Sequence, residues 1–172
     1  MKKITLFIVL LSFCFSLFSQ TQTHNEDDYS VQYPVNWKFI NDDLGLGMIF
    51  LISLDSDDRM KSAGVSLMAL DAEDSNWSVE KFGEKNLKTL RKSVGNFSLL
   101  SSGMKRDNTL NYKEFYEIVY SETTPRGNVV RHKQRYIIKN GLAFVLDLSA
   151  IDSNFNNIEG EGTSIMNSYT IK

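Results

Sequence analysis

The stretch LNYKEFYEIVYSETTPRGNVVRHKQRYIIKNGLAFVLDLSA, residues 110–150, decides the fold. It divides into three segments rich in Tyr, Phe, Val and Ile: Leu110–Glu122, Gly127–Lys139 and Leu142–Ala150. The last two are joined by Asn-Gly, the dipeptide that most strongly favours a two-residue hairpin turn. The stretch therefore predicts three consecutive antiparallel strands, which the rest of the chain must extend or cover.

The amino-terminal residues have the pattern of an export signal. Two lysines precede an apolar run, and a small residue at position 19 allows cleavage. We expect residues 1–19 to be a signal peptide, with no transmembrane segment after its removal and a periplasmic or extracellular mature protein. Residues 20–28 are polar and acidic and predict a flexible leader, followed by one domain at 29–172.

Charge and cysteine content exclude several classes of function. Without Lys2 and Lys3, 17 of the 19 basic residues remain against 21 acidic ones, a net charge of −4 that gives no general attraction to nucleic acid. The single cysteine, Cys14, lies in the signal behind the bulky Phe13, which argues against a lipoprotein. The mature chain then has no disulfide, no cysteine nucleophile and no cysteine zinc site.

Alternating or continuous apolar runs predict the remaining strands, and three-to-four-residue apolar spacing predicts two helices. The first helix spans Ser78–Val94, with Ser78 as its cap; the second starts at a cap, Asp152 or Ser153, with Gly162 on its apolar face. The other predicted strands are Tyr29–Tyr33, Trp37–Ile40, Met48–Leu54, Gly64–Leu70, Phe97–Lys105 and Ser168–Ile171.

The order of these elements resembles that of PsbP-like domains. An aromatic-led strand from Tyr29 runs into Tyr33-Pro34, and Trp37 follows after two residues; the chain then ends in a helix and a Ser-aromatic strand. The superfamily includes PsbP, a Ran-binding import factor and DcrB-type envelope proteins. The resemblance implies an α+β fold, an α/β/α sandwich with a central, mostly antiparallel sheet. It also implies a non-enzymatic accessory protein that binds other proteins.

The sequence offers no catalytic, cofactor-binding or metal-binding residues that we can name. The mature chain has two imidazoles, His24 in the leader and His132 between Arg131 and Lys133, whose charges should disfavour its protonated form. No Gly-x-Ser-x-Gly motif is present. The acidic run at 55–58 fails the EF-hand pattern, which leaves an acidic hairpin tip or a weak cation site.

One basic surface is a candidate for partner binding. Period-two alternation places Arg131, Lys133 and Arg135 on one side of their strand, and Lys113 and Arg126 can extend the patch. One interpretation is a site for an anionic partner or an unidentified envelope protein. The other is a solvated strand face whose charges are paired with glutamates such as Glu114 or Glu117 on the neighbouring strand.

The sequence thus predicts an exported binding module without cofactors. Two alternatives stay open: a hydrolase of envelope polymers that uses carboxylates in an unrecognised cleft, and a small-ligand carrier that uses the space between sheet and helix.

Overall fold

The structure is a computed structural model, and most of the chain after the predicted signal is described. The described residues are 20–27, 29–40, 48–53, 63–71 and 77–172, with only the backbone at 48–51, 53 and 71. The predicted signal peptide and the acidic run at 55–58 lie outside them. No helix within the described ranges is long and apolar enough to cross a membrane.

The three predicted central strands are confirmed as β7 (Glu114–Thr123), β8 (Val129–Lys139) and β9 (Leu142–Ile151). Both residues of the β8–β9 turn have a positive φ, 54° at Asn140 and 80° at Gly141, as in the two-residue turns that match the right-handed twist of the flanking strands. In the described chain these strands belong to a seven-stranded antiparallel sheet in the order β3-β4-β5-β9-β8-β7-β6.

The other predicted strands are confirmed as well. In the large sheet they are β3 (Trp37–Ile40), β4 (Met48–Ser53), β5 (Gly64–Asp71) and β6 (Ser98–Arg106). Among the described residues, a second sheet of three strands has the order β1-β2-β10, with β1 (Thr21–Asn25), β2 (Tyr29–Pro34) and β10 (Thr170–Ile171).

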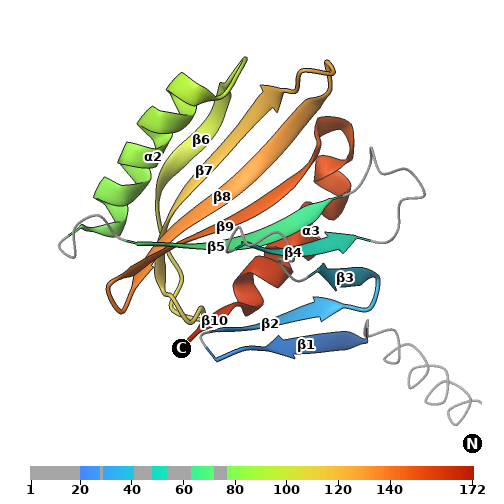
Figure 1. The fold of residues 1–172 in the computed structure, drawn as a ribbon, viewed down its shortest axis with the longest axis vertical. Helices are drawn as coiled ribbons and strands as arrows, with labels where there is room; N and C mark the ends of the chain where they lie inside the picture. The colour runs from blue at the N-terminus through green and yellow to red at the C-terminus, as the bar shows by residue number, and fades with distance from the viewer. Residues whose placement is uncertain (1–19, 28, 41–47, 54–62, 72–76) are drawn as a thin grey trace, which may run out of the picture.

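Two helices lie on opposite faces of the large sheet, as predicted for an α/β/α sandwich (Figure 1). Helix α2 (Val79–Ser93) begins at Ser78, whose hydroxyl accepts a hydrogen bond of 3.1 Å from the Lys81 N–H. Helix α3 (Asp152–Ser168) packs against β9 and the small sheet. Gly162 permits this approach, since a Cβ there would lie 2.5 Å from Leu148 Cδ1.

The first central strand begins at Glu114, four residues later than predicted. Residues 107–113 form a turn, in which Lys113 has a φ of 47° and its carbonyl accepts a hydrogen bond from the Asp107 N–H. The Asp107 carboxylate also accepts from the Thr109 N–H at 2.9 Å. Buried Leu110 and Tyr112 therefore belong to the turn, and their apolar character had suggested a strand.

The flexible leader predicted at 20–28 is wrong for Thr21–Asn25, which form strand β1. The strand pairs with β2 in the register Thr21↔Pro34 to Asn25↔Ser30, and His24 stacks on Phe39 at 3.7 Å between ring centroids. Because β1 is an edge strand whose side chains are mostly exposed, backbone pairing holds it without an apolar alternation in its sequence.

The predicted cap of α3 is also wrong. The residue before the helix is Ile151, which has no side-chain cap, and Asp152 is the first helical residue. Its carboxylate instead accepts a hydrogen bond from Arg131 on β8.

Substituting Gly83 should destabilise the fold sharply. A Cβ at this position of α2 would lie 2.2 Å from Tyr116 Cγ and 2.4 Å from Tyr116 Cβ, atoms that cannot swing aside. We expect Gly83→Ala to lower the free energy of unfolding by about 1–3 kcal/mol, measured by denaturant unfolding. Gly160→Ala, in α3 with nothing within 4 Å, is the control and should raise it by up to about 1 kcal/mol. Equal effects would contradict the close packing of α2 on the sheet.

Candidate functional site

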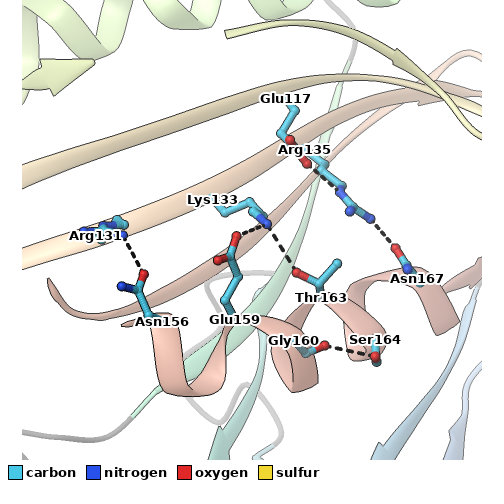
Figure 2. Close-up of polar contacts among 10 residues, drawn as sticks. All are labelled: Glu117, Arg131, Lys133, Arg135, Asn156, Glu159, Gly160, Thr163, Ser164 and Asn167. Atoms are coloured by element: carbon cyan, nitrogen blue, oxygen red, sulfur yellow. Dashed lines mark hydrogen bonds and ion pairs between the residues drawn. The ribbon is translucent and has the colours of Figure 1, made fainter. Parts of the chain in front are cut away.

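The three basic residues of β8 share one strand face, as predicted, but this face is covered by α3. Arg135 is only 5% exposed, and Arg131 and Lys133 are partly buried. Figure 2 shows all three pointing from the sheet toward the side chains of α3. The prediction of an exposed basic patch is therefore wrong for these residues.

Each of the three cations is neutralised within the molecule. Arg131 donates to Asp152 at 2.6 Å and to Asn156 at 2.9 Å. Lys133 forms an ion pair with Glu159 (Figure 2). Because Arg131 and Lys133 pair with carboxylates of α3 and Arg135 pairs with one of β7, these residues stabilise the packing of α3 on the sheet and offer nothing to an external anion.

Arg135 has the most enclosed of these sites. It donates to Glu117 at 3.2 Å, to the Tyr112 hydroxyl at 2.8 Å and to Asn167 at 2.6 Å. Glu117 is thus one of the two partners expected from the sequence, whereas Glu114 pairs with Arg106.

The two predicted extensions of the patch do not join it. Lys113 and Arg126 are both exposed, Lys113 in the turn before β7 and Arg126 in the turn between β7 and β8. These turns lie at opposite ends of β7, so the five residues do not form one surface.

His132 lies on the other face of the sheet, and the prediction that its protonated form is disfavoured is wrong. Its Nδ1 is 3.1 Å from Asp147 Oδ2, and its Nε2 is 3.5 Å from Glu122 Oε1. Burial by itself lowers the pKa of His132, but the hydrogen bond to Asp147 and the charges of both carboxylates outweigh it, and the pKa is raised.

This histidine does not have the surroundings of a hydrolytic base. Its Nε2 faces Glu122 and no hydroxyl, so the nucleophile–base contact of a hydrolase is not formed. Across the described ranges, no group of three or more His, Asp and Glu side chains is arranged to hold a metal ion.

Helix α2 carries an exposed basic surface that was not predicted from the sequence. Lys81, Lys85, Lys88 and Lys92 are all exposed, and their spacing of four, three and four residues puts them within an arc of about 60°. The buried stripe of the helix, which includes Phe82 and Gly83, lies on its opposite side. We call these four residues the lysine row; their helical spacing was the signal that could have revealed it.

Among the described residues, the far half of the lysine row forms no ion pair. No described acidic side chain lies within 4.0 Å of the Lys88 or Lys92 ammonium group. The near half lies over Trp77, with Lys81 Nζ 5.2 Å and Lys85 Nζ 4.5 Å from its ring centroid. Trp77 also packs on Phe82, as predicted, at 6.2 Å between centroids, so the row starts from an aromatic side chain fixed to the core.

Solved structures share this architecture at low sequence identity. CyanoP, the PsbP of the cyanobacterium Synechocystis sp. PCC 6803, superimposes with a TM-score of 0.59 over 90% of this chain and 94% of its own, at 12% identity. The chain has a PsbP-like fold. This likeness confirms the resemblance inferred from the order of the elements, and at this identity it extends to the fold alone.

Two further structures have the same PsbP-like fold. PA94, a Pseudomonas aeruginosa protein of unknown function, has a TM-score of 0.62, 11% identity and coverage of 87% of this chain and 95% of its own. LpqN of Mycobacterium tuberculosis, which is involved in cell envelope biogenesis, has a TM-score of 0.55, 16% identity and coverage of 93% and 95%. No protein-family model matches the sequence, and no curated protein matches it significantly.

Removing Arg135 should be far more costly than removing an exposed arginine. Arg135→Ala leaves the Glu117 carboxylate, whose side chain is 15% exposed, without its cation, and we expect a loss of about 3–5 kcal/mol in the free energy of unfolding. Arg106→Ala breaks a pair whose side chains are 73% and 45% exposed, and it should cost at most about 1 kcal/mol. Denaturant unfolding measures both, and similar losses would refute the enclosed character of the Arg135 site.

Proposed function

We propose that the chain is an exported, non-enzymatic accessory protein that binds an acidic partner protein in the cell envelope through the lysine row of α2. The observation that carries the proposal is the contrast between two sets of cations. Those of β8 are paired inside the molecule, whereas Lys88 and Lys92 point outward with no described anion beside them.

Charge complementarity favours an acidic partner. The mature chain has an expected net charge of −4, so a row of four lysines about 17 Å long is a local exception that orients and accelerates the approach of an anionic surface. The export-type amino terminus and the fold shared with LpqN, which is involved in cell envelope biogenesis, support the location. A hydrolase has less support, because the one enclosed imidazole has no nucleophile beside it.

Charge reversal on the row should abolish partner binding. We expect Lys88→Glu with Lys92→Glu to weaken capture of envelope proteins by the immobilised mature chain at least about tenfold, measured by quantitative mass spectrometry. Raising the salt concentration should weaken the wild-type interaction in the same direction. The matched control is Lys113→Glu with Arg126→Glu, an equal change of charge at exposed turns away from α2.

The position of the partner distinguishes this proposal from a general charge effect. Since the mature chain is expected to contain no cysteine, a single Thr89→Cys beside the row can carry a photo-crosslinker, with Ser153→Cys on α3 as the opposite-face control. The proposal requires that the captured protein crosslink from position 89 and not from 153. Equal loss of capture in both charge reversals, or crosslinking from 153 alone, would refute it.

A further inference from the structure

His132 lies at the centre of a polar contact that spans three strands. It stands opposite Tyr120 on β7 and Ser149 on β9 in the strand register. Its two ring nitrogens reach diagonally in opposite directions, Nδ1 to Asp147 on β9 and Nε2 toward Glu122 on β7. The exposed fractions of the three side chains are only 14%, 18% and 30%, so water competes weakly for these contacts.

The two possible protonation states of the ring satisfy this arrangement unequally. A neutral imidazole has a single N–H and can donate to one carboxylate only. The buried Nε2 atom has no hydrogen-bond partner at its 3.5 Å separation from Glu122, whereas Nδ1 is within hydrogen-bond distance of Asp147. An imidazolium has two donors, one for each carboxylate, and its charge offsets theirs.

The groups around the ring also favour the protonated imidazole. Tyr120 stacks on His132 at 4.7 Å between centroids and an interplanar angle of 7°, and Phe97 stacks on the far side of Tyr120 at 5.1 Å. The cationic neighbours in the sequence, Arg131 and Lys133, lie on the opposite face and are paired with α3. Among the described residues, the titratable groups facing the ring are therefore Glu122 and Tyr120 from β7 and Asp147 from β9.

We propose that Glu122, His132 and Asp147 form a proton-operated clamp, which ties β7, β8 and β9 together when the imidazole carries both protons and releases them when it loses one. The clamp does not rest on the proposed function, since none of its three residues belongs to the lysine row.

The direction of the pH effect follows from the raised pKa of His132. A group whose pKa is higher in the folded than in the unfolded chain stabilises the fold fully below the unfolded value, about 6.5 for histidine. This stabilisation disappears as the pH rises through the folded value.

Nuclear magnetic resonance of the two imidazoles tests the clamp directly. The mature chain is expected to contain only His24 and His132, so His24→Gln leaves a single imidazole signal, that of His132. We expect the pKa of His132 to lie above the ordinary histidine value of about 6.5. Asp147→Asn and Glu122→Gln should each lower the pKa of His132.

Stability measurements provide an independent check. Each unit by which the folded pKa exceeds the unfolded one should appear as a tenfold loss in the folding equilibrium constant between about pH 6 and the alkaline end of the titration. His132→Gln should flatten this dependence. A pKa of His132 at or below the ordinary value of about 6.5, or an unchanged pH dependence in Glu122→Gln and Asp147→Asn, would overturn the clamp even where His132→Gln fails to fold.

Discussion

A cation that is withdrawn from water must meet an anion, and this requirement fixes where α3 lies on the sheet. Arg131, Lys133 and Arg135 recur every second residue of β8, about 6.8 Å apart. Their partners on α3 are Asp152, Glu159 and Asn167, which lie about two helical turns apart, roughly 10–12 Å, and the long basic side chains span the difference. Sliding α3 by one turn would leave buried charges unpaired at a cost of several kcal/mol. The same shift would move Gly162 away from Leu148, where a Cβ has no room, so charge pairing and close packing together specify the register of the helix.

Strand β8 carries a second, separate group of paired charges on its other face. There the imidazole of His132 stands between two carboxylates, while the adjacent Arg131 and Lys133 act on the far side of the sheet. In a strand, residues next to each other in sequence are divided by the sheet, whereas diagonal residues on neighbouring strands are within hydrogen-bond distance. Electrostatic interactions along β8 therefore depend on strand register rather than on sequence order.

This explains which features the sequence could predict. Periodicity and turn residues determined the central strands and α2, because these signals act within one segment. The alternation along β8 was also evident, but it cannot say which face a distant helix covers, and so the basic face was taken as exposed. The state of His132 was mispredicted because its partners come from β7 and β9. Strand β1 was missed because an edge strand held by backbone pairing needs no apolar pattern.

The outer side of α2 is under none of these constraints. Its inner side must supply Phe82 and a residue without a side chain at 83, where Tyr116 leaves no space. The lysine row lies on the opposite side, and its first two members contact Trp77. Exposed charges of this kind change stability little, so the residues at these positions can change without loss of the fold. A fold that persists at 11–16% identity can thus keep its architecture while the residues on its outer helix face differ.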